Sequence, residues 1–561
     1  MLFDYLVKPY FEQHKYVIFG YLLLIIVSIP LEAVVLPHVY GKMFNSIKSS
    51  NLGSNIWNFT DNINKENFAG TSILLFGVWV LIIGSSVTKH FFESFLVPEY
   101  MKYSRDIIYE KTIEAYSSDF RDMKTGEYLS RVLELTRNFK DLFQYILSRA
   151  FPELMICLFI VGYFLFNQIH LGLLCVSCIS LSIIIHWFGG RYLINKVKEK
   201  EQYYDGVVGE NLQDSLDNLM NIYINNEVKA QIKKNEMLEE NNNKNMKHIM
   251  TVQNSVIGIT QFINTFCYGF SLLLIYYLLK SKKITIKEAI VYILIMGQLV
   301  SYLYPANSGF VHNVIYKLGI IEASREHLEG LLSVDTNKKN IDCINKGCVE
   351  FKNVGFSYNK DSKESLFTDL SLKLDSEKKY GMVGRSGSGK STLMKMLVGL
   401  YPVDKGEISI DGTNIKTIKP EYLRERVNYV NQRTGLFNEP IVENMLYGNE
   451  KVSKTELLKK LEEYKLLDVF SDLPDGINAS AGVHGNNLSG GMQKITMLMR
   501  GILKPCKILI LDEPLAGLDQ HTRVKVIDMI NIESKGKTLV IITHDKEILP
   551  HMDEIININK L

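Results

Sequence analysis

Long apolar runs fill the first half of the chain, and shorter alternating runs fill the second. The hydrocarbon core of a bilayer is about 30 Å thick, so a helix that crosses it needs about 20 mostly apolar residues. Six segments approach this length, near residues 16–37, 71–88, 151–166, 171–188, 255–279 and 288–305. Six such runs are too many for the core of one soluble domain. The pattern therefore predicts an all-α transmembrane domain with six spans over residues 16–334.

Residues 1–15 mix apolar and charged side chains. This mixture suits an amphipathic helix on the membrane surface, and it suits a solvated tail equally well. The first apolar run is longer than that of a cleavable signal peptide and lacks a small-residue cleavage site. We therefore expect it to be a span.

The loops between the spans alternate in length and charge. Those over residues 90–150 and 190–254 are long, their apolar spacing suits helices that continue out of the membrane, and each holds nine Lys or Arg. The loops over 38–70 and 281–287 hold three Lys each and no Arg. By the positive-inside rule, the long loops and the N-terminus face the cytosol.

The second half has the alternation of strands and helices that is typical of an α/β domain. Predicted strands are Val349–Phe351, Lys379–Val383, Ile508–Leu511 and Thr538–Thr543. We place this domain at residues 347–561, after a polar linker at 335–346. The chain's formal net charge of +2 is too small for a protein that coats nucleic acid.

A glycine-rich run after the strand Lys379–Val383 matches G-x-x-x-x-G-K-[ST] and precedes an apolar helix, which is the context of a phosphate-binding loop. Its residues are Gly384, Arg385, Ser386, Gly387, Ser388, Gly389, Lys390, Ser391 and Thr392. Backbone N–H groups and the helix N-terminus would bind phosphates. Lys390 would reach the β- and γ-phosphates, and Ser391 would ligate Mg²⁺.

Two further motifs complete the pattern. The buried strand Ile508–Leu511 ends in Asp512, which suits Mg²⁺, and Glu513, which suits a general base for water. Upstream lies Leu488-Ser-Gly-Gly-Met-Gln. In this order and spacing, the three motifs resemble the nucleotide-binding domain of the ATP-binding cassette (ABC) family, which has a P-loop NTPase-like fold.

The resemblance implies ATP, Mg²⁺ and roles for further residues. Tyr358 matches the aromatic residue that stacks on adenine, Gln432 the glutamine that contacts Mg²⁺ and water, and His544 the histidine on the γ-phosphate. Residues that would act on the nucleotide bound by a partner chain are Ser489, Gly490, Gly491, Gln493 and Asp519. The chain departs from the family pattern at Val483, Glu439-Pro440 and Ala516-Gly517.

The six spans and two long loops look like an exporter-type half-transporter. In that family short helices of the loops couple the membrane domain to the cassettes. The residues that match these positions are Thr125, Gly126, Glu127, Asp214 and Asp217. A peptide-processing exporter would need an N-terminal protease domain, and we expect none in residues 1–15.

Several polar residues lie within the predicted spans. Glu32 suits a functional site or the membrane interface, and His186 suits a packed or interfacial position. Polar side chains that would line a cavity or bond between helices are Gln261, Asn264, Tyr292 and Gln298. Asn58 begins a glycosylation sequon in a loop predicted to lie outside.

These observations predict an ATP hydrolase that drives efflux or flipping of an amphipathic small molecule, lipid or peptide across the plasma membrane by alternating access. Every catalytic residue is present, so we expect a homodimer, with a heterodimer as the alternative. An ATP-gated channel or regulator on the same scaffold is the second alternative. An importer would keep its cassette on a separate chain, and the six spans exclude a soluble cassette ATPase.

Overall fold

A computed structural model describes residues 2–48, 68–117, 120, 125–325, 344–358, 365–432 and 435–560. The chain forms two compact units. The first comprises Met1–Thr112 and Lys124–Ser333, and the second comprises Ile113–Met123 and Val334–Leu561.

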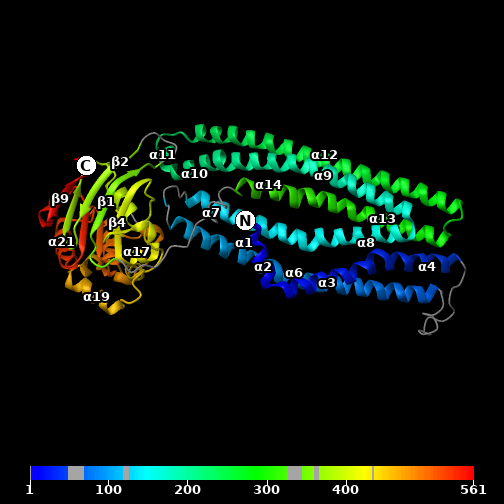
Figure 1. The fold of residues 1–561 in the computed structure, drawn as a ribbon, viewed down its shortest axis with the longest axis horizontal. Coiled ribbons are helices and arrows are strands. Elements are labelled where there is room, and N and C mark those ends of the chain that lie inside the picture. Colours follow the sequence, from blue (N-terminus) through cyan, green and yellow to red (C-terminus); the bar gives the residue numbers. More distant parts are fainter. Residues whose placement is uncertain are drawn as a thin grey trace. The chain divides into compact units, whose positions relative to one another are not determined.

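The first unit is helical throughout its described residues. Its α-helices are α1 (Leu2–Leu6), α2 (Lys8–Gln13), α3 (Lys15–Pro30), α4 (Leu36–Lys48), α6 (Phe68–Tyr116), α7 (Thr125–Tyr145), α8 (Phe151–Asn167), α9 (Ile169–Tyr203), α10 (Glu210–Asp217), α11 (Leu219–Ile224), α12 (Val228–Lys280), α13 (Ile286–Gly309) and α14 (Tyr316–Ala323). The last four residues of α6 group with the second unit. The long helices α9 and α12 lie side by side (Figure 1).

Six helical runs are long and apolar enough to cross a membrane, which confirms the six predicted spans. They extend over Lys15–Ser46, Phe68–Tyr116, Leu133–Asn167, Ile169–Asp217, Val228–Lys280 and Ile286–Ala323. Each is longer than its apolar core, because polar turns continue the helix beyond the roughly 20 residues that a bilayer requires. The third span, the shortest in the sequence, gains its length from residues 133–150.

Turns of π-helix join several of these helices, namely η1 (Leu31–Val35), η2 (Ile146–Ala150), η3 (Tyr204–Gly209) and η4 (Phe310–Ile315). Pro37 and Pro152 follow η1 and η2. Each proline lacks the N–H that an α-helix would donate to the carbonyl four residues earlier, inside the π-helical turn. The prolines thus account for two of the irregularities.

The N-terminal residues pack onto the bundle. Leu6 and Tyr10 are buried, and the Tyr10 hydroxyl donates to the Leu96 carbonyl at 2.7 Å. The Tyr10 ring also contacts Tyr100 and Phe143. The apolar side of this segment therefore contacts the helical bundle. Neither interpretation of the sequence, a helix on the membrane surface or a solvated tail, predicts this contact.

The second unit is α/β. Its strands are β1 (Val349–Phe356), β2 (Phe367–Leu374), β3 (Lys379–Val383), β4 (Lys405–Ile410), β5 (Thr413–Asn414), β6 (Val427–Val430), β7 (Ile508–Asp512), β8 (Thr538–Ile542) and β9 (Glu554–Asn557). Its helices are α16 (Lys390–Leu397), α17 (Pro420–Arg426), α18 (Ile441–Leu446), α19 (Lys454–Glu463), α20 (Gly490–Leu503) and α21 (Gln520–Glu533). The predicted fold class is confirmed, and all four predicted strands are present.

Two sheets organise this unit. An antiparallel sheet has the order β2-β1-β4-β5, and a parallel sheet has the order β6-β7-β8-β3-β9. β7 and β8 are buried along their whole length, as expected of central parallel strands with both faces covered. The segment Ile113–Met123 belongs to the same unit: the Phe120 amide donates to the Leu400 carbonyl at 2.9 Å, and Arg424 donates to the Ser117 carbonyl.

Candidate functional site

The candidate site lies where four strands of the parallel sheet end. β6, β7, β8 and β3 are parallel neighbours, so their carboxyl ends meet at one edge. In α/β folds this edge is where ligands bind. The residues that follow these strands are Asn431 and Gln432, Glu513, Thr543 and His544, and the loop that begins at Gly384. Four motifs that lie far apart in the sequence are thus brought to one edge.

The loop after β3 is shaped as a cradle. Gly389, the N-cap of α16, has φ +89°, which favours glycine, and a Cβ there would collide with the Phe367 ring. The buried Lys390 ammonium donates to the carbonyls of Gly384 at 2.8 Å and Arg385 at 2.9 Å. The buried Ser388 Oγ has no hydrogen-bond partner. The loop thus holds a cation and an unused hydroxyl beside a helix N-terminus.

Asp512 is buried at the end of β7 and fixed on both sides. The Tyr429 hydroxyl donates to Asp512 Oδ2 at 2.9 Å, and Lys494 Nζ donates to the Asp512 carbonyl at 3.2 Å. Burial, and then the Asp512 carboxylate, raise the pKa of Tyr429, so its hydroxyl stays protonated and donates. The Ser391 hydroxyl lies close enough to Tyr429 to counteract part of this rise in its pKa. The Tyr429 phenol is therefore a neighbour of both Ser391 and Asp512.

The next residue, Glu513, turns back toward β8. Its φ is +46°, its amide donates to the Ile542 carbonyl at 2.9 Å, and Thr543 Oγ1 donates to Glu513 Oε2 at 3.3 Å. Burial lowers the pKa of Lys390, and the carboxylates of Glu513 and Asp512 counteract this effect. Lys390, Asp512 and Glu513 therefore interact electrostatically.

The remaining predicted residues of this edge are more open. His544 and Gln432 are exposed at the ends of β8 and β6. Tyr358 is half exposed; its hydroxyl hydrogen-bonds Thr392 and its ring packs edge-on against Phe356. Tyr358 thus presents an aromatic surface beside the start of α16.

The sequence reasoning missed Tyr429, Lys494 and Thr543, which position the two carboxylates. Tyr429 and Thr543 lie within the motifs that contain Gln432 and His544. β6 is buried at both ends and intermediate between them, so burial along the strand does not single out Tyr429. Lys494 directly follows the motif Leu488-Ser-Gly-Gly-Met-Gln, but only the fold shows its contact with Asp512.

The residues predicted to act on a partner's nucleotide lie at the N-termini of two other helices. They are Ser489, Gly490, Gly491, Gln493 and Asp519. Ser489 caps α20, with Oγ accepting from the Met492 amide at 3.3 Å. Asp519 caps α21, and Thr522, whose amide donates to it at 3.0 Å, holds the pKa of Asp519 below its usual range. Gln493 Nε2 donates to the Gly485 carbonyl at 2.9 Å. Between these side chains and the Gly384–Gly389 loop, the described residues show no hydrogen bond.

Two of the three departures from the family pattern have structural roles. Pro440 forms an isolated antiparallel β-bridge with Ser480 and is the N-cap residue of α18. The neighbouring Glu439 carbonyl accepts a hydrogen bond from the Ala481 amide at 2.9 Å. Gly517 has φ +78°, and the Ala516 amide donates to the Glu513 carbonyl at 3.3 Å. Val483 is exposed.

The predicted coupling residues fall on two helices. Thr125, Gly126 and Glu127 begin α7, and their side chains lie outside the described part of the structure. Asp214 and Asp217 are exposed on α10. The predicted sequon at Asn58 lies outside the described residues.

Some polar residues of the helical bundle bond between helices, and one packs against an aromatic ring. Glu32 lies in η1; Tyr302 donates to its carboxylate, and Gln298 Nε2 donates to its carbonyl at 2.9 Å. Asn264 is buried against Cys178, so Gln298 and Asn264 bond between helices. His186 is buried and packs edge-on against Phe310.

Two family models match the chain. The model of the ABC transporter transmembrane region matches residues 18–303, half of the chain, and the ABC transporter model matches residues 367–516. The chain belongs to the ABC transporter family. It is a multi-pass membrane protein with an ATP-binding domain, and the order of the two domains is that of a half-transporter.

Curated relatives and a solved structure are similar to this ABC transporter. A putative export ATP-binding/permease protein of Rickettsia bellii is 32% identical over 47% of each chain. An ATP-dependent lipid A-core flippase of Idiomarina loihiensis is 33% identical over 45% of this chain and 42% of that protein. The chain thus spans about half the length of the curated relatives it matches. A bacterial Atm1-family ABC exporter with ATP bound has the same fold, with TM-score 0.82, 19% identity, and coverage of 97% of this chain and 93% of that chain.

Proposed function

We propose that this ABC transporter hydrolyses ATP and uses the energy to export, or flip between leaflets, an amphipathic substrate by alternating access. The observation that carries the proposal is the grouping of Lys390, Asp512 and Glu513 at one sheet edge, in a chain with six apolar spans. The similarity to a lipid A-core flippase supports an amphipathic substrate.

The residues at the sheet edge would share the work of phosphoryl transfer to water. ATP would bind with its phosphates in the Gly384–Gly389 loop and its adenine on Tyr358. Lys390 would neutralise phosphate charge, and Glu513, held by Thr543, would take the proton of the attacking water. His544 and Gln432 follow neighbouring strands and would contact the γ-phosphate and the water. Catalysis would come mainly from positioning and charge neutralisation.

The donor set fits Mg²⁺. Mg²⁺ prefers oxygen ligands and usually combines one or two carboxylates with phosphates and water. The residues Ser391, Gln432 and Asp512 offer a hydroxyl, an amide and a carboxylate oxygen. Tyr429 hydrogen-bonds Asp512 and lies close to Ser391. When bound, Mg²⁺ would supply charge stabilisation of the phosphates.

A second copy of the chain would complete each site. Ser489, Gly490, Gly491, Gln493 and Asp519 lie at helix N-termini, which attract anions, and would serve the nucleotide of the partner. Because one chain carries every catalytic residue, two copies give two competent sites. Exposed apolar residues beside Asp214 and Asp217, including Leu216 and Met220, would dock the long loop onto a cassette.

The charge bias of the loops supports an orientation with the N-terminus, long loops and cassette in the cytosol, where ATP is present. We place the transporter in the plasma membrane. Substrates would then move outward or between its leaflets.

ATPase rates in lipid nanodiscs test the proposal. We expect Glu513→Gln to lower the rate about a hundredfold or more, the range for loss of a general base, and to retain ATP binding. Glu554→Gln, an exposed carboxylate on β9, is the matched control and keeps the wild-type rate. A panel of lipids, peptides and amphipathic drugs should contain a class that shifts the rate. A wild type no faster than Glu513→Gln would instead favour a channel, a regulator or an obligate heterodimer.

A further inference from the structure

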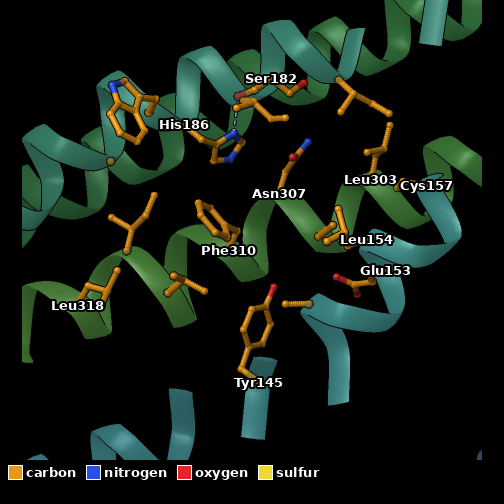
Figure 2. Close-up of a pocket in the computed structure, with 18 of the residues that line it drawn as sticks. Tyr145, Glu153, Leu154, Cys157, Ser182, His186, Leu303, Asn307, Phe310 and Leu318 are labelled. Atoms are coloured by element: carbon orange, nitrogen blue, oxygen red, sulfur yellow. Dashed lines mark hydrogen bonds between the residues drawn. The ribbon is translucent and has the colours of Figure 1, made fainter. Parts of the chain in front are cut away.

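A cavity of about 400 Å³ lies within the first unit, between α8, α9 and the end of α13 with η4 (Figure 2). Most of its wall is apolar, formed by Leu154, Ile179, Ile183, Leu303, Phe310 and Leu318 among others. Pockets of 300–1,000 Å³ with apolar walls and a few polar groups are typical of small-molecule sites.

Four buried polar atoms of this wall have no hydrogen-bond partner. They are Glu153 Oε2, Ser182 Oγ, His186 Nε2 and Asn307 Nδ2. Their residues are 9%, 4%, 8% and 8% exposed. A buried polar group without a partner costs about 1–3 kcal/mol, so four around one cavity require an explanation. Figure 2 shows Glu153, His186 and Asn307 on three different helical segments around the same space.

Two of these atoms, His186 Nε2 and Glu153 Oε2, favour a ligand that donates hydrogen bonds, whereas Asn307 Nδ2 is itself a donor. His186 Nδ1 lies 2.7 Å from the Ser182 carbonyl, and a carbonyl only accepts, so Nδ1 carries the proton. In the neutral ring Nε2 is then an acceptor. When Glu153 is ionised, its Oε2 is an acceptor with negative charge. The Arg149 guanidinium and the Lys89 ammonium group attract this carboxylate, but neither donates a hydrogen bond to Glu153 Oε2.

The helices around the cavity contain π-helical turns close to two of these polar residues. η2 ends at Ala150 and η4 begins at Phe310, and both residues line the cavity. Single π-helical turns inside α-helices are often found at functional sites. These turns set the positions of Glu153 and Asn307, which lie three residues from them along the chain.

We infer that this cavity binds an amphipathic amine, with its ammonium group against Glu153 and its apolar body against Leu154 and Phe310. The inference rests on the proposed function, because it names the class of substrate that the transporter carries. An anion would meet the Glu153 carboxylate unfavourably. A purely apolar ligand would leave all four polar atoms without partners.

Equilibrium binding to the full chain in phosphatidylcholine nanodiscs tests the inference. The probes are 4-(1-naphthyl)butylamine and the corresponding alcohol and carboxylic acid, with binding to protein-free nanodiscs subtracted. At pH 7 the amine is protonated. We expect the wild type to bind the amine about tenfold or more tightly than the alcohol, and the acid most weakly. The amine should also change the fluorescence of Trp187, which lines the cavity, and Trp187→Phe should remove that change.

The variants separate charge recognition from structural damage. Glu153→Gln keeps the shape of the side chain, and we expect it to abolish the preference for the amine while alcohol binding is retained. Glu99→Gln, an exposed carboxylate on α6, keeps the wild-type preference. Equal binding of amine and alcohol by the wild type, or an equal loss of both in Glu153→Gln, would overturn the inference.

ATPase activity in the same nanodiscs distinguishes this failure from failure of the proposed function. A wild type that hydrolyses ATP but shows no amine preference refutes the cavity assignment alone. A wild type that prefers the amine but hydrolyses no ATP upholds the cavity assignment and refutes the proposed motor.

Discussion

Asn444 and Asn307 are both buried amides, and they differ in what surrounds them. Asn444, in the nucleotide-binding unit, is 0% exposed; its oxygen accepts from the Phe437 amide at 2.9 Å and Arg500 Nη2 at 2.8 Å, and its nitrogen donates to the Phe437 carbonyl at 3.0 Å. Asn307, in the membrane unit, is 8% exposed, and its Nδ2 has no partner. One amide closes a turn, and the other faces a cavity.

The difference separates a polar group that holds the fold together from one that faces a cavity. A fully bonded buried amide contributes to stability, whereas an unbonded one lowers it. The nucleotide-binding unit follows the same rule: in its phosphate loop, Ser388 Oγ is buried without a partner. Unbonded polar atoms thus occur both at the proposed phosphate site and at the proposed amine site.

The largest expected effect is on Asn444. Asn444→Leu leaves the Phe437 amide and Nη2 of the half-buried Arg500 without their acceptor, although Arg500 Nε keeps its bond to the backbone carbonyl of residue 444. We therefore expect a loss of about 3–4 kcal/mol. For a domain of this size that lowers the unfolding transition by about 8–12 °C. Calorimetry of the nucleotide-binding unit's transition in the full chain measures it. Asn486→Leu, at an exposed position, is the control; equal shifts for both would show that the hydrogen bonds of Asn444 add nothing.

The second prediction concerns ATP binding at the phosphate loop, where Lys390 would bond the phosphates. Lys390→Met removes the ammonium group that would bond two phosphates, at about 1.5 kcal/mol or more for each charged bond. We expect ATP affinity to fall about a hundredfold, measured with a fluorescent ATP analogue in nanodiscs. Lys395→Met, on the same helix with its ammonium group over the Tyr401 ring, should change affinity less than threefold. Unaltered affinity in Lys390→Met would exclude the phosphate role.

The two sites were unequally predictable from sequence. Phosphate binding needs a fixed spacing on one strand, loop and helix, so Gly384–Thr392 were apparent, and neighbouring parallel strands bring Glu513 and Gln432 to the same edge. The cavity is assembled from α8, α9 and α13, whose apolar sequences carry no spacing rule. His186 was expected to be packed or interfacial. It is packed, but only the fold shows that its second nitrogen lies without a partner in the wall of a cavity.

Asn307 should respond to the same substitution in the opposite direction. Asn307→Leu removes an unbonded buried amide and keeps the branched shape of the side chain, so we expect the membrane unit to gain about 1–2 kcal/mol. The thermal transition of the nanodisc-embedded bundle should rise by a few degrees. A fall in the transition would mean that Asn307 has a structural partner in the membrane.

The smallest effect concerns a charged group that is well bonded. Asp411, in the turn between β4 and β5, accepts hydrogen bonds from the amides of residues 345–348 at 2.8–3.1 Å. Burial alone would raise the pKa of Asp411, but these amides outweigh burial and hold the pKa below its ordinary value. Asp411→Asn keeps a residue type that tolerates the positive φ of this position, and we expect it to cost about 1 kcal/mol at pH 7.

The pH dependence of that cost distinguishes the carboxylate from the turn itself. Because the folded pKa lies below the unfolded value of about 3.9, the stabilisation is fully present above pH 5 and is lost as pH falls through the folded pKa. The difference in unfolding transition between wild type and Asp411→Asn should therefore be constant from pH 7 to pH 5 and should narrow below pH 4. A difference that stayed constant down to pH 3 would mean that the negative charge of Asp411 is not what the four amides stabilise. The cost of Asp411→Asn would then come from the conformation of the turn, and the contrast between the well-bonded Asp411 and the unbonded Glu153 would not be one of charge.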